Sequence, residues 1–230
     1  MTLDQLSQND NPSPSVDKTV LEGPFLHADD AAYWAHRHIG GGRSVEYGGV
    51  ILKKGTRFFA SIPQPSSGQF VRSDLVRVSP EGKMIFPDGY TPYAFYHSHP
   101  KQAQPDGQPT VPDEMWSVYS GMFSYTDIER IIENGSVVPA HYLSGPGDAL
   151  IKYVVSGSIK ERELISRLRP EDHRPFDFFT DYIPLMAGAG ELSVVFASKA
   201  WGGNRGRVGE DWRVGVPLAA EVLQPLFEKI

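Results

Sequence analysis

Residues 91–100, TPYAFYHSHP, form an apolar run of β character that ends in two histidines. Residues i and i+2 of an extended chain project to the same face, so the imidazoles of His97 and His99 can converge on one metal ion. Pairs of this kind also arise by chance in surface strands. A metal site therefore requires a further ligand from elsewhere in the chain.

The segment 124–135, SYTDIERIIENG, predicts a helix with Ser124 near its N-cap and Gly135 at its end. Asp127 lies in the first turn, where the helix dipole favours an acidic residue even without a metal. Brought against the two histidines, this carboxylate would be a third protein ligand. The fourth position would then be left to water, as is typical of a catalytic rather than a structural zinc site.

A second carboxylate, Glu46, begins the segment 46–55, EYGGVILKKG. This segment predicts a strand, joined to a second strand at 57–62, RFFASI, by a hairpin turn at Lys54 and Gly55. The two glycines inside the first strand predict close approach of another backbone or of a ligand. An isolated Glu at a strand end is most often simply solvated, so Glu46 alone identifies no site.

The rest of the chain predicts further strands and helices. Segments of β character are found at 69–76, 137–143, 149–155 and 191–198. The middle two flank the tight turn Gly145–Asp148 and predict a hairpin. Helices are predicted at 29–39, 159–168, 176–188 and 217–229. Residues 100–116 hold four prolines and little periodicity, which predicts a long loop, and the polar residues 1–18 predict a loose tail.

Composition excludes several functions. The 230 residues include no cysteine, which rules out disulfides, cysteine-ligated zinc and thiol nucleophiles. The formal net charge of -6 argues against nucleic acid or an anionic membrane as partner, because both are bound through clustered Lys and Arg. Neither a signal peptide nor an apolar run of bilayer length is found. We therefore expect a cytoplasmic protein, with export by a route that uses no cleaved signal as the alternative.

The order of these motifs resembles the JAMM/MPN metalloprotease family, whose pattern is a glutamate, then H-[ST]-H-P, then S-x-x-D. Here the pattern is carried by Glu46, His97, Ser98, His99, Pro100, Ser124 and Asp127. The resemblance covers residues 29–155. It looks closest to a bacterial JAMM-like domain of uncharacterised function, often found in polymorphic toxins, with EYGG, YH[ST]H and S-x-x-D motifs. It implies an α/β (α+β) fold in which a mixed, cytidine deaminase-like β-sheet is flanked by helices.

The resemblance also implies a chemistry. His97, His99 and Asp127 would bind Zn²⁺, Glu46 would act as general base on a water molecule, and Ser124 would help to hold the oxyanion. The implied activity is hydrolysis of a peptide or isopeptide amide in a protein or peptide substrate, and the toxin-like context is compatible with an immunity or partner protein. Two alternatives stay open: a non-catalytic MPN-like binding or scaffold protein, and a bacterial effector with other amidase chemistry. Deaminase chemistry is excluded, because its zinc signature needs cysteines.

One departure from the family pattern concerns spacing. Residues 100–123 separate the second histidine from Ser124, which is longer than the family's spacing and predicts an insertion at the mouth of the site. The acids Asp113 and Glu114 within it are lesser candidates for the third ligand. The expected organisation is a disordered tail (1–20), a JAMM-like domain (21–157) and a C-terminal α/β extension packed on it (158–230).

Several other histidine and aromatic residues belong to no catalytic or metal-binding motif. His36 and His38, near the end of the first predicted helix, are expected to be solvated or to interact with the helix dipole. Tyr96 is placed beside the histidines and is expected to border the cleft. Residues 201–212, WGGNRGRVGEDW, predict a surface loop with no nucleotide-binding pattern.

Overall fold

The computed structural model of the chain describes residues 20–39, 44–65, 75–100, 112–168, 182–196, 198–214, 218 and 226. Within these residues, nine strands form one sheet in the order β1-β3-β2-β7-β8-β9-β10-β11, with β4 also paired to β2. The strands are β1 (Leu21–Phe25), β2 (Tyr47–Lys54), β3 (Arg57–Ser61), β4 (Gln64–Pro65), β7 (Thr91–Ser98), β8 (Ala140–Gly145), β9 (Ala149–Val154), β10 (Glu191–Phe196) and β11 (Gly206–Arg207). A separate hairpin is formed by β5 (Arg77–Val78) and β6 (Met84–Ile85).

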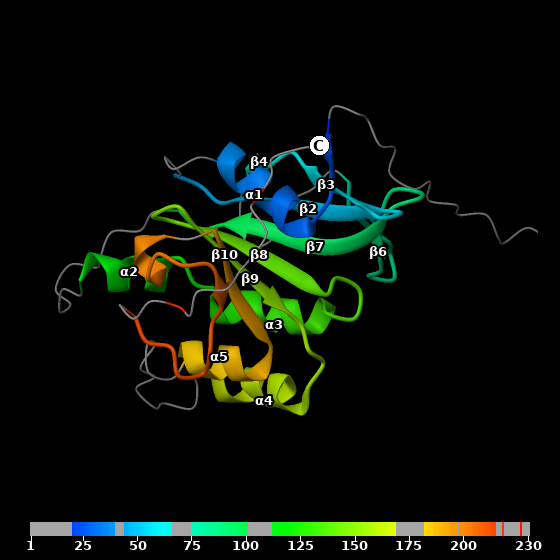
Figure 1. Cartoon of the computed structure of the whole chain (residues 1–230). Helices are drawn as coiled ribbons and strands as arrows, with labels where there is room; N and C mark the ends of the chain where they lie inside the picture. The colour runs from blue at the N-terminus through cyan, green and yellow to red at the C-terminus, as the bar shows by residue number, and fades with distance from the viewer. Residues whose placement is uncertain are drawn as a thin grey trace, which may run out of the picture.

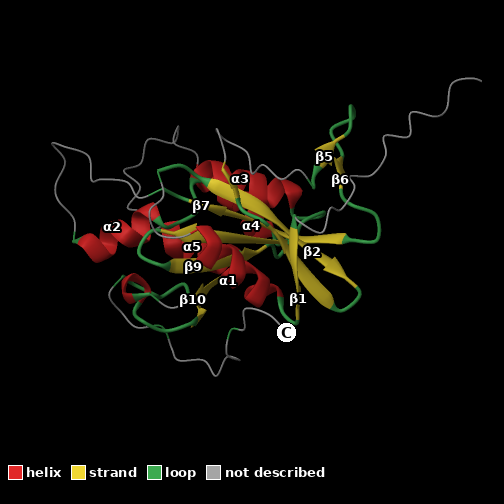
Figure 2. Ribbon diagram, turned by 90° about the horizontal axis from the view of Figure 1, so that it is seen from above, coloured by secondary structure: helices red, strands yellow, loops and turns green. Residues whose placement is uncertain are grey.

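Helices cover both faces of the sheet. They are α1 (Ala28–Ile39), α2 (Asp113–Ser120), α3 (Tyr125–Asn134), α4 (Ile159–Leu168), α5 (Ile183–Ala189) and the short 3-10 helix η3 (Lys199–Trp201). In Figure 1, α1 lies on one face and α3, α4 and α5 lie on the other, while α2 lies towards one end of the strands. Figure 2 shows the β5–β6 hairpin towards the opposite end. The prediction of a mixed sheet flanked by helices is confirmed as a description of the architecture.

The central strands β7 and β8 pair in parallel, whereas the other pairings in the described sheet are antiparallel. Parallel neighbours cannot be joined by a tight turn, so the chain must return along a face of the sheet before β8 begins. The segment that contains α2 and α3 makes this return. The carboxyl end of β7 and the beginning of α3 therefore lie at the same edge of the sheet.

One of the two glycines of β2 makes room for a side chain of β7. A Cβ at Gly49 would collide with the ring and hydroxyl of Tyr96. That hydroxyl donates to the carbonyl of Ser61 at 2.5 Å, and the Ser61 hydroxyl accepts from the N–H of Val50 at 2.9 Å. The space at Gly49 is taken by side chains, so the prediction that another backbone or a ligand approaches this glycine is wrong. Tyr96 is buried in the cluster that packs on α1, so the prediction that it borders the cleft is wrong.

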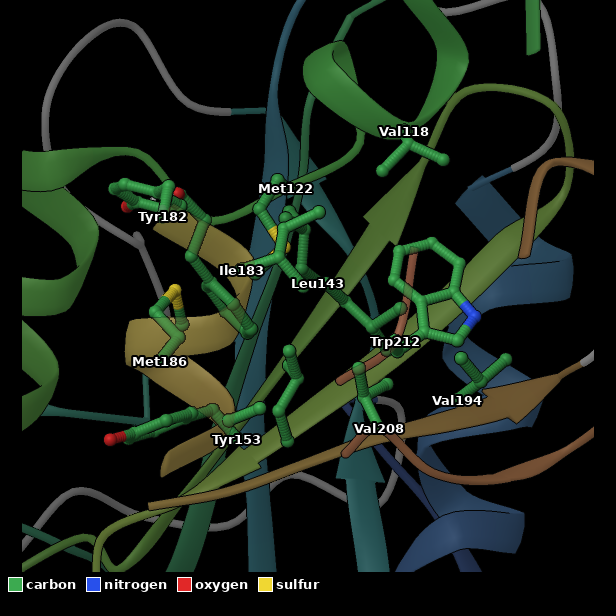
Figure 3. Packing of buried hydrophobic residues seen from close by; sticks show 14 of the residues in the cluster. Val118, Met122, Leu143, Tyr153, Tyr182, Ile183, Met186, Val194, Val208 and Trp212 are labelled. Carbon is green, nitrogen blue, oxygen red and sulfur yellow. Dashed lines mark hydrogen bonds between the residues drawn. The ribbon is translucent and has the colours of Figure 1, made fainter. Parts of the chain in front are cut away.

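The largest apolar core lies between the sheet and helices α3, α4 and α5. Figure 3 shows part of it, with Leu143 and Tyr153 of the sheet facing Ile183 and Met186 of α5. The rings of Trp201 and Trp212 stack in this core with centroids 4.8 Å apart, and both residues are buried, as is Val208. The prediction of a surface loop over residues 201–212 is wrong, because these three apolar side chains anchor the segment.

Most predicted elements are confirmed. The helices at 29–39, 124–135 and 159–168 and both hairpins are present, and the second half of the helix at 176–188 is α5. The predicted long loop is wrong from Asp113 onward, where the chain forms α2 and buries Val118 in the core. The tail, most of the strand at 69–76 and most of the helix at 217–229 lie outside the described residues.

β10 pairs with β9, so the chain after residue 157 continues the same sheet. Buried side chains from this part of the chain belong to the same apolar core as those of α3. Among the helices in the described part of the chain, none has both the length and the apolar character that crossing a bilayer requires.

A prediction concerns His141 of β8, which is buried and whose Nε2 has no hydrogen-bond partner within the described structure. Burial, helped by the nearby His97, lowers the pKa of His141 from 6.5 to about 3. Between those two values the unfolded chain binds a proton that the folded chain does not, so the free energy of unfolding falls as pH falls through this window. One such proton gives a slope of at most about 1.4 kcal/mol per pH unit.

Urea unfolding of the wild type and of His141→Phe between pH 7 and pH 4, in the presence of a chelator, measures this effect. Phe is uncharged throughout and fits beside Phe95, whose ring centroid lies 5.7 Å from that of His141. The stability difference between the two proteins is expected to shift in favour of the variant as pH falls. A difference that does not change with pH contradicts the assignment of a neutral, buried His141.

Candidate metal centre

Two histidines of β7 and an aspartate of α3 meet at the shared edge of the sheet. Nε2 of His97 lies 3.4 Å from Oδ1 of Asp127, and Nε2 of His99 lies 3.3 Å from Oδ2 of the same carboxylate. Three candidate ligand atoms, one from each residue, lie within 4.8 Å of one another. Over the described ranges, this is the one group of His and carboxylate side chains arranged so that it can hold a metal ion.

The donor atoms and their spacing fit a zinc ion. Zinc binds imidazole nitrogen and carboxylate oxygen at about 2.0–2.1 Å in a tetrahedron, which puts neighbouring ligand atoms about 3.3–3.4 Å apart. Each histidine lies at this distance from a different oxygen of the Asp127 carboxylate, and three candidate ligand atoms, one per residue, lie within 4.8 Å of one another. Nε2 of His97 is also buried without a hydrogen bond in the described structure. Its 3.4 Å contact with Asp127 lacks hydrogen-bond geometry, and a metal ion bound between the two atoms would satisfy this buried nitrogen.

His99 is held in place by two backbone carbonyls. Its main-chain N–H donates to the carbonyl of Ser144 at 3.2 Å, and its ring Nδ1 lies 3.1 Å from the carbonyl of Ser120. Because a carbonyl only accepts, Nδ1 carries the proton, and Nε2 of the neutral ring is free to bind a metal. Contacts of this kind fix the tautomer and orientation of metal-binding histidines.

The charges in the cluster favour an ionised carboxylate. Burial by itself raises the pKa of Asp127, but the charges and contacts of His97 and His99 outweigh it and hold that pKa well below its usual range. Burial by itself lowers the pKa of His99, but Asp127, the Ser120 carbonyl and the charge of Glu46 together raise it. A proton and a metal ion would therefore compete for His99, while Asp127 stays available as a ligand at neutral pH.

Ser124 orients Asp127 through a capping box. The N–H and the hydroxyl of Ser124 both donate to Oδ2 of Asp127 at 2.7 Å, and the N–H of Asp127 donates to the Ser124 hydroxyl oxygen at 3.2 Å. The predicted N-cap is thus confirmed, and such caps stabilise a helix by about 1 kcal/mol. The hydroxyl proton of Ser124 is engaged with the candidate ligand, so its role as an oxyanion donor stays a prediction.

Glu46 lies beside His99 because of the strand register. Gly48 of β2 pairs with His97 of β7 in an antiparallel register. Glu46 and His99 lie just beyond the paired residues, and the same register continued by two residues would bring them opposite each other. The charge of Glu46 contributes to the raised pKa of His99, as expected of a near neighbour. Glu46 is half-buried and does not belong to the three-residue cluster.

Ser98, between the two histidines, ties the ends of the two strands together. It is fully buried, and its hydroxyl oxygen accepts from the N–H of Tyr47 at 2.9 Å. Tyr47 directly follows Glu46 in the chain. The backbone that carries the candidate base is thus fixed to the backbone that carries the candidate ligands.

Of the two lesser candidates for the third ligand, the structure describes the side chain of only one. Asp113 is exposed at the start of α2 and is outside the cluster. The side chain of Glu114 lies outside the described residues. Of the acids proposed from the sequence, Asp127 is the one that the structure brings to both histidines.

Sequence reasoning missed the residues that support the cluster. Ser120 and Ser144 act through carbonyl groups, for which no sequence pattern exists. His36 was predicted to be solvated or to interact with the helix dipole, and this is wrong. It is 2% exposed, with Nδ1 2.5 Å from the Ser144 hydroxyl. The available signal was its position four residues after Ala32, on the buried face of α1. His38 is exposed, as predicted.

Comparison of the chain with models of protein families, with curated proteins and with solved structures gave no match. The resemblance to the JAMM/MPN family therefore stays a prediction.

A prediction follows for metal content. The purified protein, loaded with zinc and dialysed, is expected to retain about one equivalent, because two imidazoles and an ionised carboxylate converge. His97→Ala and Asp127→Ala each remove one ligand and are expected to retain almost none, as measured by elemental analysis. His38→Ala, which changes an exposed histidine of α1, is the control and retains the wild-type amount. A wild type without zinc, or Asp127→Ala with a full equivalent, contradicts the assigned ligands.

Proposed function

We propose that this chain is a zinc-dependent hydrolase with a JAMM/MPN-type fold, which cleaves a peptide or isopeptide amide bond in a protein or peptide substrate. The observation that carries the proposal is the convergence of His97, His99 and Asp127 at one sheet edge, with Glu46 beside them but outside the cluster. Three protein ligands leave one tetrahedral position open, which is the arrangement of catalytic zinc sites.

The cluster is partly shielded and still borders solvent. The side chains of His97 and His99 are 11% and 12% exposed, and that of Asp127 is 24% exposed. Partial burial strengthens electrostatic interactions, because the local dielectric is lower than that of water. The remaining exposure leaves an approach for a substrate carbonyl group.

The chemistry divides between the metal and the protein. Zinc at this site would supply a Lewis acid that lowers the pKa of water towards neutrality and polarises a carbonyl group. In the proposed mechanism, Glu46 takes the proton that the water loses as its oxygen attacks the carbonyl carbon. The same carboxyl group then gives this proton to the leaving nitrogen as the C–N bond breaks. The products are a carboxylic acid and an amine, and Glu46 is ionised again.

The remaining side chains of the motif orient these groups. Ser124 holds Oδ2 of Asp127, and Ser98 holds the segment that carries Glu46. A contact between Ser124 and the oxyanion would require its hydroxyl to leave Asp127. We therefore assign Ser124 first to positioning and second to oxyanion stabilisation.

The variant Glu46→Gln tests the base. Gln keeps the size and polarity of the side chain but cannot take a proton, so zinc content is expected to be unchanged and hydrolysis to fall by about 10²-fold or more. The zinc-loaded proteins are incubated in H₂¹⁸O with an unfolded protein mixture and with ubiquitin-type isopeptide-linked dimers. Mass spectrometry then identifies newly formed carboxyl termini, which carry ¹⁸O if water is the nucleophile.

Three outcomes contradict parts of this account. Loss of zinc from Glu46→Gln would make Glu46 a ligand, and unchanged hydrolysis would remove it as the base. A wild type that holds zinc but forms no labelled termini from either substrate would contradict the hydrolase and favour a binding or scaffold protein.

Replacement of Ser98 tests how the base is positioned. Ser98→Ala removes the acceptor for the Tyr47 N–H and loosens the segment that carries Glu46. Because small misplacements of catalytic groups are costly, kcat is expected to fall by about tenfold or more. Zinc affinity is expected to stay near that of the wild type, and Ser98→Thr, which keeps the hydroxyl, retains more activity than Ser98→Ala. Equal kcat values for Ser98→Ala and the wild type would refute this role.

A further inference from the structure

A second polar cluster lies on the opposite face of the sheet from the metal centre. Nδ1 of His36 lies 2.5 Å from the hydroxyl of Ser144, and its Nε2 lies 3.1 Å from Oδ1 of Asp148. His36 comes from α1, Ser144 from β8, and Asp148 from the turn between β8 and β9. Along β8, Ser144 has the same parity as Tyr142, which packs on the α1 side, whereas Leu143 belongs to the core on the other side.

The cluster is not a second catalytic site. A serine, a histidine and an aspartate joined by hydrogen bonds can activate a serine for attack on a carbonyl group. Here, however, both Ser144 and His36 are 2% exposed, so a substrate carbonyl group has no access to the hydroxyl. The effect of the cluster must therefore pass through the backbone that it holds.

Ser144 connects the cluster to the metal centre. Its hydroxyl contacts His36 on one face of the sheet, and its carbonyl accepts the main-chain N–H of His99 at 3.2 Å at the sheet edge. A shift of the β8 end would therefore move the backbone of a candidate metal ligand. This is a path of two hydrogen bonds from α1 to the site.

The second carbonyl that holds His99 depends on the same strand end. Ser120, which accepts from Nδ1 of His99, immediately precedes Gly121 at the end of α2. A Cβ built on Gly145 of β8 would lie 2.9 Å from the Cα of Gly121, so the two backbones are in direct contact. The β8 end therefore accepts the N–H of His99 directly and lies against the backbone that follows Ser120.

Asp148 holds the other end of this segment against α1. Its backbone has a φ of 62°, a left-handed conformation that Asp tolerates better than most residues. Its carboxylate contacts Nε2 of His36 at 3.1 Å and Nη1 of Arg37 at 3.6 Å. The segment from Ser144 to Asp148 is thus tied to α1 at both ends.

We propose that His36 is a positioning residue of the metal centre. By holding Ser144 and Asp148, His36 fixes the end of β8, and the β8 end fixes His99 through the carbonyls of Ser144 and Ser120. This inference rests on the proposed zinc site. It means that the zinc affinity depends on a histidine outside the motif, on the face of the sheet opposite the metal centre.

The variants His36→Phe and His36→Asn test this role. Phe keeps a ring and removes both hydrogen bonds, whereas Asn keeps an acceptor near the position of Nδ1. His38→Phe, an exposed position two residues away on the same helix, is the matched control. For each protein we would measure the zinc dissociation constant by chelator competition, hydrogen exchange of the His99 amide in the metal-free protein by NMR, and the thermal midpoint.

His36→Phe is expected to weaken zinc binding by about tenfold, the low end for residues that support metal ligands. Exchange of the His99 amide in the metal-free protein is expected to accelerate by a similar factor. His36→Asn recovers part of both effects, and His38→Phe changes neither. Ser144→Ala, a smaller change at the other end of the hydrogen bond, is expected to act in the same direction if His36→Phe does not fold.

A folded His36→Phe with wild-type zinc affinity and wild-type exchange at His99 would overturn the proposal. A lowered thermal midpoint alone would also overturn it, because a merely structural role moves that value and leaves the other two. If the wild type binds no zinc, the proposed function fails, but exchange of the His99 amide still shows whether His36 positions this residue.

Discussion

The parallel pairing of β7 with β8 is the constraint on which the candidate site depends. Because parallel neighbours require a crossover, the chain leaves the carboxyl end of β7, forms α2 and α3, and returns along the sheet. The crossover brings the first turn of α3, with Asp127, to the strand end that carries His97 and His99. Antiparallel pairing of β7 with β2 brings Glu46 to the same edge.

The surroundings of the cluster match the needs of a dication. With Asp127 as the proposed ligand and Glu46 as a neighbour, two negative charges would balance the charge of a zinc ion, which a partly buried site requires because unpaired charge is costly there. The two imidazoles add no charge when neutral. Backbone carbonyls of Ser120 and Ser144 hold one of these rings from two directions. Rigid orientation of this kind keeps the ligand geometry in place before the metal binds.

The sequence predicted the parts of the site that depend on local rules. Strand alternation places His97 and His99 on one face, and capping preferences place Ser124 and Asp127 at a helix start. The coarse fold followed from the same patterns. The structure of the segment between His99 and Ser124 was harder to predict. Its prolines predicted a loop, but α2 forms there because tertiary contacts bury Val118.

Contacts between residues far apart in the sequence could not be predicted from local patterns. His36 and its partners are 108 and 112 residues apart, and no local pattern records such a contact. The carbonyls of Ser120 and Ser144 are equally invisible, because every residue has one. Trp201 and Trp212 are separated by a Gly- and Arg-rich stretch, which predicts a solvated loop. In the structure the two rings stack on each other and both are buried.

We propose that one zinc ion binds among three side chains at the carboxyl end of β7. Diffraction from crystals of the zinc-loaded protein, measured above and below the zinc absorption edge, tests it most directly. One anomalous peak is expected about 2.0–2.2 Å from Nε2 of His97, Nε2 of His99 and a carboxylate oxygen of Asp127. A peak elsewhere, or none at this edge of the sheet at full zinc loading, would contradict a zinc site formed by these three residues.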